Sequence, residues 1–194
     1  MMDARTFILI GLSWLSVGAS ASAQPARTTY TIKPSEVTTP DGVPLGKFQR
    51  VTRPFRNWTL ICDENLKARK RVCNVTQAII DQNGATAFSW SLAGSDGGSP
   101  VLILRTPSNV GRDAPVTLSF DDKSAPIVVR TTGCNERVCV GVQPVGPRLR
   151  TYIAKAAVVL VTFSLPAGAT PESRPSVIGL FATFDGLSEA VASI

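Results

Sequence analysis

Four cysteines in two close pairs place the strongest constraint on how this chain can fold. Cys62 and Cys73 flank one short polar stretch, and Cys134 and Cys139 flank a shorter one. Because each pair brackets a plausible turn, we expect two local disulfides that each clip a hairpin, and the chain-entropy model gives closures of this size about 2 to 3 kcal/mol each. The sequence does not exclude a crossed connectivity. Disulfides persist in oxidising compartments, which argues against a reducing cytoplasm.

A zinc site is the alternative use of four cysteines. Structural zinc sites usually pair their ligands as C-x₂₋₄-C units, and only Cys134 with Cys139 approaches that spacing. Cys62 and Cys73 are too far apart for such a unit. No redox-active C-x-x-C motif occurs either. We therefore predict neither a bound metal nor another cofactor.

The N-terminus has the pattern of a cleaved secretory signal peptide. Arg5 precedes an apolar stretch from Phe7 to Val17, and the small residues Ala21 to Ala23 follow it. This stretch is shorter than the roughly 20 residues that a transmembrane helix needs. We predict that residues 1–23 are removed and that the mature chain reaches the periplasm without a transmembrane segment. Outer-surface association and secretion are the alternatives.

The mature chain divides into an arm and one domain. Residues 24–47 contain four prolines among threonines and small residues, so we predict a flexible arm there. From Phe48 onward, short apolar runs alternate with turn signals. We predict a single β-rich domain over residues 48–194.

Runs rich in β-branched and aromatic residues predict the strands of this domain. The predicted strands are residues 58–62, 72–77, 87–93, 101–106, 116–120, 127–131, 138–142, 158–165 and 177–184. Residues 63–71, between the first two strands, predict a loop. Apolar residues at near-helical spacing predict short helices over residues 149–156 and 187–191. This pattern favours a mainly β fold, an antiparallel β-sandwich or barrel-like domain with one or two short helices.

The residue inventory argues against an enzyme. The chain contains no histidine, which removes the usual general base near neutral pH and excludes a Ser-His-Asp triad. No S-x-x-K motif occurs. The carboxylate pairs Asp63-Glu64 and Asp121-Asp122 lie where turns are expected, and aspartate favours turns. We predict no catalytic residues.

The chain is basic, and one charge cluster stands out. The net charge of +6 favours contact with anionic surfaces such as lipopolysaccharide, acidic glycans or phospholipid headgroups, whereas nucleic acid is not an expected partner outside the cytoplasm. A disulfide between Cys62 and Cys73 would present the basic residues between them as a projecting finger. The residues of this basic finger are Lys67, Arg69, Lys70 and Arg71. A solvated loop without a partner is the alternative interpretation.

Two further arginines are candidate contacts with an anionic partner. Arg148 and Arg150 lie near the start of the predicted helix at residues 149–156. The helix dipole disfavours positive charge at that end. Their position therefore favours contact with a partner over stabilisation of the helix.

The spacing of an F-x-x-W-x-x-x-C motif and the order of the cysteines make the chain similar to a known family. The residues that carry this similarity are Phe55 to Cys62, Arg71 to Cys73 followed by Gln77, Gly133-Cys134 through Cys139, and Gly179 to Phe181 ahead of Ala190. From Phe48 to its C-terminus the chain resembles the bacterial invasion-associated locus B family. The resemblance implies an exported, β-rich envelope protein of Gram-negative alphaproteobacteria, in a family named for a member associated with entry into host cells. It carries over no catalytic residues.

Three functional hypotheses follow from the export signal, the charge and the resemblance. The first is a non-enzymatic periplasmic or envelope-associated binding protein that contacts a protein or an anionic envelope or host glycan. The second is a surface-exposed or secreted factor that assists host-cell invasion. The third is an unrecognised periplasmic enzyme.

Overall fold

The computed structural model describes residues 32–33, 37–94, 98–167 and 174–194. The chain splits into two compact units, Met1–Thr38 and Thr39–Ile194. The predicted signal peptide and much of the predicted arm lie outside the described residues. The few described residues of the first unit form no helix or strand, and every element named below belongs to the second unit. Across the described ranges, no helix has the length and apolar character needed to cross a membrane.

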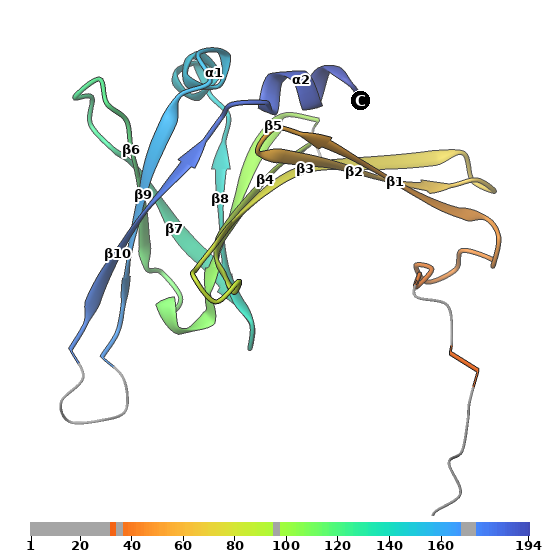
Figure 1. The fold of residues 1–194 in the computed structure, drawn as a ribbon, viewed down its shortest axis with the longest axis horizontal. Coiled ribbons are helices and arrows are strands. Elements are labelled where there is room, and N and C mark those ends of the chain that lie inside the picture. The colour runs from red at the N-terminus through yellow and green to blue at the C-terminus, as the bar shows by residue number, and fades with distance from the viewer. Residues whose placement is uncertain (1–31, 34–36, 95–97, 168–173) are drawn as a thin grey trace, which may run out of the picture. The chain divides into compact units, whose positions relative to one another are not determined.

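The second unit is built on a single antiparallel sheet of ten strands (Figure 1). In chain order the strands are β1 (Phe48–Phe55), β2 (Trp58–Asn65), β3 (Lys70–Ile80), β4 (Thr86–Gly94), β5 (Pro100–Pro107), β6 (Pro115–Ser119), β7 (Ile127–Cys134), β8 (Val138–Pro144), β9 (Val158–Leu165) and β10 (Ser176–Thr183). The helical segments are η1 (Ser108–Val110), α1 (Pro147–Ala154) and α2 (Leu187–Ala192). The strands lie in the order β1-β2-β3-β4-β5-β8-β7-β6-β9-β10, so β1 and β10 are the two edges. This architecture confirms the prediction of a mainly β, sandwich-like domain with short helices.

Strand β1 was not predicted, and the predicted loop at residues 63–71 is wrong. Strand β2 continues to Asn65 and β3 begins at Lys70, so the connecting turn shrinks to residues 66–69. Within the sheet, strand β1 has β2 as its neighbour on one side alone. It carries exposed polar residues on both faces, so it lacks the alternation that marks a half-buried strand. Its register sets Arg50 opposite Asp63, and Arg50 donates hydrogen bonds of 2.6 and 2.8 Å to that carboxylate. Cross-strand pairs of this kind extend β2 beyond its apolar run.

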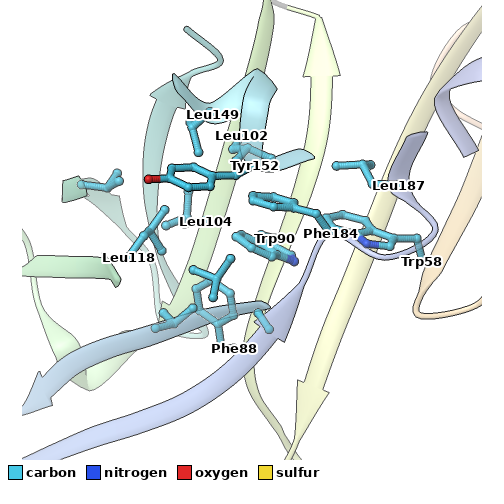
Figure 2. Packing of buried hydrophobic residues seen from close by; sticks show 14 of the residues in the cluster. Trp58, Phe88, Trp90, Leu102, Leu104, Leu118, Leu149, Tyr152, Phe184 and Leu187 are labelled. Atoms are coloured by element: carbon cyan, nitrogen blue, oxygen red, sulfur yellow. The ribbon is translucent and has the colours of Figure 1, made fainter. Parts of the chain in front are cut away.

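The hydrophobic core lies between the two halves of the sheet, which curl toward each other. Trp90 on β4 stacks on Phe184, just after β10, with ring centroids 5.0 Å apart, although β4 and β10 are distant in the strand order. Trp58 stacks on Trp90 at 5.6 Å, and Phe88 packs edge-on against Trp90 at 5.8 Å (Figure 2). Burying side chains of this size contributes about 1.5 to 3 kcal/mol each, and aromatic pairs add about 0.5 to 1.5 kcal/mol. The aromatic cluster therefore holds the two halves together.

A buried glutamine side chain ties the same two halves together by hydrogen bonds. Gln77 on β3 donates to the carbonyl oxygens of Asn57 at 3.1 Å and Thr183 at 3.2 Å. Its own carbonyl oxygen accepts from the indole N–H of Trp90 at 3.0 Å and from the backbone N–H of Thr183 at 3.3 Å. Trp58 adds a hydrogen bond from its indole N–H to the carbonyl oxygen of Thr183 at 3.0 Å. These bonds fix the end of β10 against β2, β3 and β4.

Helix α2 packs against β1, β2 and β3, and Gly186 determines how the chain enters it. Leu187 and Ala190 are fully buried beneath the helix. Gly186 has a φ of 89°, in the left-handed region. A Cβ atom at this position would lie 2.6 Å from the carbonyl oxygen of Phe55. Both the left-handed φ of this residue and the short distance from its Cβ position to Phe55 therefore require glycine.

Candidate functional site

The basic finger is a tight, internally bonded turn between β2 and β3. The side-chain oxygen of Asn65 accepts hydrogen bonds from the backbone N–H groups of Lys67 at 3.1 Å and Ala68 at 3.0 Å. Arg69 takes a left-handed φ of 53°, which reverses the chain into β3. The backbone N–H of Leu66 donates to the carbonyl oxygen of Lys47 at 2.9 Å, which anchors the turn to the chain before β1. The finger is therefore a defined projection of the sheet.

Both disulfides are local, as each cysteine spacing favours. Cys62 and Cys73 face each other directly across β2 and β3, at the base of the basic finger. Arg71 lies beside this bridge, with its guanidinium N–H donating to the sulfur of Cys62 at 3.3 Å. Cys134 and Cys139 likewise face each other across β7 and β8. Because every cysteine is oxidised, none is a free thiol.

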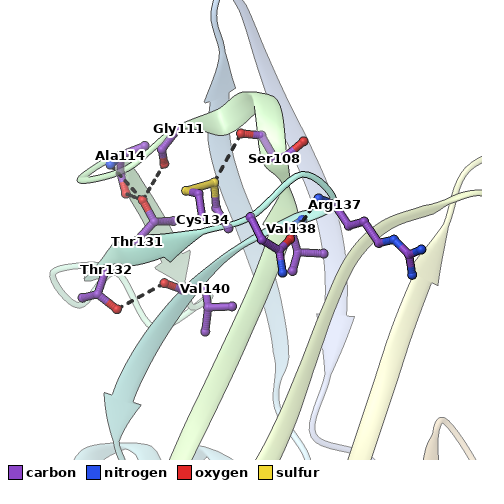
Figure 3. Close-up of a disulfide and its surroundings, with 11 residues drawn as sticks. Ser108, Gly111, Ala114, Thr131, Thr132, Cys134, Arg137, Val138 and Val140 are labelled. Atoms are coloured by element: carbon purple, nitrogen blue, oxygen red, sulfur yellow. Dashed lines mark hydrogen bonds between the residues drawn. A yellow bond between two sulfur atoms is a disulfide. The ribbon is translucent and has the colours of Figure 1, made fainter.

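The second disulfide lies in a closely bonded hairpin that contacts η1 (Figure 3). The sulfur of Cys139 lies 3.3 Å from the carbonyl oxygen of Ser108. Nearby, the buried Thr131 hydroxyl donates to the carbonyl oxygen of Gly111 at 2.7 Å and accepts from the N–H of Ala114 at 3.0 Å. Within the described ranges, no group of three or more His, Cys, Asp or Glu side chains is placed to hold a metal ion. The contact of Cys139 and the hydrogen bonds of Thr131 attach this hairpin to η1 and to the segment that precedes β6.

The four cations of the basic finger are exposed and have no acidic partner. Lys67, Arg69, Lys70 and Arg71 form no ion pair with any residue that the structure describes. Strand β2 carries two acids beside the finger. Asp63 is paired with Arg50 at 2.6 Å, and Glu64 lies opposite Arg71 in the register without forming an ion pair with any described residue. Hydrogen bonding from the Arg50 guanidinium lowers the pKa of Asp63. The finger therefore sets four cations beside one acid without an ion pair, Glu64, and presents net positive charge.

An apolar groove begins at the base of this finger and runs along α2. Two adjoining cavities, of about 150 and 340 Å³, share the lining residues Leu92, Pro100 and Val191. The first cavity reaches Cys73, and the second reaches Arg150 on α1. We call these two cavities together the apolar groove. It connects the base of the basic finger with one of the two helix arginines.

The structure separates Arg148 and Arg150. Arg150 lines the apolar groove, with its Nε–H donating to the carbonyl oxygen of Val145 at 3.3 Å. The guanidinium of Arg148 donates to the hydroxyl of Ser124 and the carbonyl oxygen of Ala125. These bonds attach the turn before β7 to α1, so they explain the position of Arg148 without a partner. Arg150 is the arginine of this pair that borders a cavity.

The Arg148 network includes a carboxylate with a lowered pKa. Asp122 accepts a hydrogen bond from the Tyr152 hydroxyl at 2.6 Å, and the Tyr152 ring stacks on Phe120 with centroids 3.6 Å apart. Hydrogen bonds from Ser124 and then from Tyr152 lower the pKa of Asp122 to about 2. Of the two adjacent acids Asp121 and Asp122 noted in the sequence, Asp122 takes part in this structural network.

This lowered pKa predicts a titration of the turn around Asp122. The network favours the ionised carboxylate, so it is intact above the ordinary aspartate pKa and is lost as the pH falls through about 2. We expect the Asp122 carboxyl carbon, followed by NMR, to titrate near pH 2. Removing its donors with Ser124→Ala and Tyr152→Phe should move the midpoint upward. A midpoint that is unchanged by both substitutions contradicts the hydrogen-bond explanation.

Sequence reasoning missed the apolar groove and the glutamine contacts. The groove residues Leu92, Pro100 and Val191 come from β4, β5 and α2, so no local pattern brings them together. Gln77 stood out only in the family pattern. The role of Gln77 becomes visible only in the structure, where its side chain bonds to Thr183, a residue distant in the chain. The same Thr183 carbonyl oxygen also accepts a hydrogen bond from Trp58.

Known proteins are similar to this chain over most of its β-rich unit. A family model described as invasion associated locus B (IalB) protein matches residues 58–194. A crystal structure of invasion associated protein B from Bartonella henselae is similar with a TM-score of 0.58 and 18% sequence identity, and the match covers 74% of this chain and 93% of that chain. At this identity the likeness shows a shared fold. No curated protein sequence matches the chain.

Proposed function

The chain belongs to the invasion associated locus B family, and from this premise we propose that it is an exported, non-enzymatic envelope protein that binds anionic lipid. The partner we propose is lipopolysaccharide or another acylated anion of the envelope. The single observation that carries the proposal is the continuity of the basic finger with the apolar groove. Export agrees with two disulfides, which persist in oxidising compartments.

The finger matches the anionic part of such a ligand. Its four cations lack acidic partners among the described residues, and the Cys62–Cys73 bridge at its base restrains the hairpin. Each Lys or Arg near an anionic membrane surface contributes about 1 kcal/mol of attraction. Contacts of this kind weaken as salt rises, because they lie in solvent.

The groove matches the acyl part of the same ligand. Its shared walls are the apolar side chains of Leu92, Pro100 and Val191. Arg150 at the far end supplies a further cation. A purely polysaccharide partner would leave this apolar surface unused, so an acylated anion fits both halves of the site.

Removing the finger charges tests the proposal. We expect the variant Lys67→Gln, Arg69→Gln, Lys70→Gln and Arg71→Gln to lose about a thousandfold in affinity for lipopolysaccharide at low salt, since four surface cations of about 1 kcal/mol each are removed. Affinity is measured by titration at several salt concentrations, with thermal unfolding as the check on folding. The salt dependence of the variant should be shallower than that of the unaltered protein.

A matched control separates the finger from net charge. Arg53, Arg112, Arg137 and Lys155 are exposed, and no hydrogen bond or ion pair of their side chains is found among the described residues. Replacing these four with glutamine removes the same charge and should change affinity by less than about threefold. Equal losses in the two variants would contradict a localised site. Delipidated polysaccharide should bind more weakly than intact lipopolysaccharide, because it lacks the chains proposed for the groove.

A surface-exposed factor that assists host-cell invasion is the second candidate function. It is favoured by the description of the family and by the name of the Bartonella protein, which both refer to invasion. The two candidates differ in compartment. Labelling of Lys67 and Lys70 in intact cells by a membrane-impermeant amine reagent supports surface exposure, and labelling only after lysis supports the periplasm.

A further inference from the structure

The two edges of the sheet differ sharply in chemistry. Strand β1 carries Arg50, Arg53 and Pro54, which are residues that discourage pairing with another strand. Strand β10 has the sequence SVIGLFAT and carries no charge or proline. A long apolar edge without these protections is a ready site for strand pairing.

The unpaired backbone groups of β10 can be assigned from the glutamine contacts. Thr183 uses its N–H and C=O toward Gln77, and these groups therefore point away from β9. Antiparallel pairs alternate between bonded and non-bonded, so every second residue from Thr183 points its backbone groups outward in the same way. The outward residues are Phe181, Gly179 and Val177. Within the described part of the chain, no partner is found for these outward backbone groups.

Apolar side chains cover the outer face of this edge. Val177 is 74% exposed and Phe181 is 71% exposed, with Gly179 between them. The alternate residues Ile178, Leu180 and Ala182 face the core. The edge therefore exposes both backbone hydrogen-bonding groups and apolar surface.

Open space adjoins one end of β10. Strand β3 pairs with β2 only as far as Thr76, but it pairs with β4 as far as Ile80. A cavity of about 410 Å³ is lined by Ile79 and Ile80 at the end of β3 and by Phe181 on β10. Ile80, on its far wall, is 62% exposed. An incoming strand thus has room beside Phe181.

We propose that β10 pairs with β10 of a second copy of this chain, antiparallel across a two-fold axis at Gly179. In this register the two Gly179 residues exchange backbone hydrogen bonds. Val177 of each copy lies opposite Phe181 of the other, which is a β-branched and aromatic cross-strand pair. The absence of a side chain at Gly179 leaves room between them.

The chemistry of the strand favours a second copy over an unrelated partner. Two-fold pairing across Gly179 sets each residue opposite a residue of the same strand, so a single charge in β10 would meet either its like or an uncharged residue. Strand β10 has no charge and meets this requirement along its whole length. The outward donors and acceptors of one edge complement those of an identical edge turned end for end. This dimer is independent of the proposed lipid site, which lies along α2.

The effect of Gly179→Lys on self-association tests the dimer. A Cβ at this position would meet only Leu160 and Thr162 side chains, both at 3.8 Å, so the monomer tolerates a side chain. In the dimer the two lysines would lie directly opposite each other. We expect sedimentation velocity to show a concentration-dependent dimer of the unaltered protein, with dimerisation at least about tenfold weaker in the variant. A monomer at all concentrations, or a dimer that Gly179→Lys does not weaken, overturns the proposal.

Cysteine cross-linking tests the register. Bonded antiparallel pairs have Cα atoms about 5.5 Å apart, which suits a disulfide. Gly179→Cys should therefore form a covalent dimer under a glutathione buffer at micromolar protein. The control Thr52→Cys lies on the other edge strand, β1, and should remain uncross-linked. Equal cross-linking of the two variants contradicts pairing at β10.

Discussion

Replacing Gly186 with alanine should lower the free energy of unfolding by about 3 kcal/mol or more. A left-handed conformation costs a non-glycine residue about 1 to 3 kcal/mol, and forced overpacking adds a similar amount. Gly186 has a φ of 89°, and its added Cβ would meet the Phe55 carbonyl oxygen at 2.6 Å. Neither partner can move easily, because Phe55 closes the paired strand β1 and Gly186 precedes the buried Leu187. Urea unfolding followed by tryptophan fluorescence measures the loss.

A second glycine separates the conformational cost from the clash. Gly84 also has a positive φ, of 80°, but a Cβ there meets nothing within 4 Å. Gly84→Ala should therefore lower stability by only about 1 kcal/mol, the cost of the conformation alone. If the two alanine variants lose the same stability, the contact with Phe55 does not determine the entry into α2.

Replacing Gln77 with methionine should also lower the free energy of unfolding by about 3 kcal/mol or more. The substitution keeps the length of the side chain but removes the partner of the Trp90 indole N–H, the Thr183 backbone N–H and the Asn57 carbonyl. Each buried polar group left unpaired costs about 1 to 3 kcal/mol. The loss should appear in urea unfolding and in faster hydrogen exchange of the Thr183 amide.

The position of Gln77 makes this result specific. Gln82 lies in the exposed turn after β3, and Gln82→Met should change stability by less than about 0.5 kcal/mol. An effect of Gln77→Met as small as that of Gln82→Met would contradict the role of the glutamine in holding β10. Unchanged exchange at Thr183 would contradict it as well.

The parts of the fold that local patterns predict are those with one buried face. Trp58 and Leu60 alternate with half-buried residues along β2, and this period of two reveals the strand. The cysteine spacing likewise marks two hairpins, because each bridge joins residues that face each other. Strand β1 could not be predicted in this way because few of its side chains are buried. It is held by pairing with β2, as between Arg50 and Asp63.

The candidate site was predictable only where it is local in sequence. The basic finger is one turn, so its four cations are visible as a run of residues. The apolar groove needs Leu92, Pro100 and Val191 from three elements, and tertiary packing alone brings them together. Arg148 and Arg150 look alike in sequence, but positions two apart on a helix face different directions. One bonds to Ser124, and the other borders the groove.

Lysine footprinting of the bound protein tests the proposed site most directly. An amine reagent is applied to the purified protein with and without lipopolysaccharide, and the modification of each lysine is measured by mass spectrometry. Lys67 and Lys70 lie in the basic finger, whereas Lys123 and Lys155 are exposed elsewhere. Binding through the finger predicts at least about fivefold slower modification of Lys67 and Lys70, with little change at Lys123 and Lys155. Equal protection of all four lysines, or protection of Lys123 and Lys155 alone, would contradict the proposal.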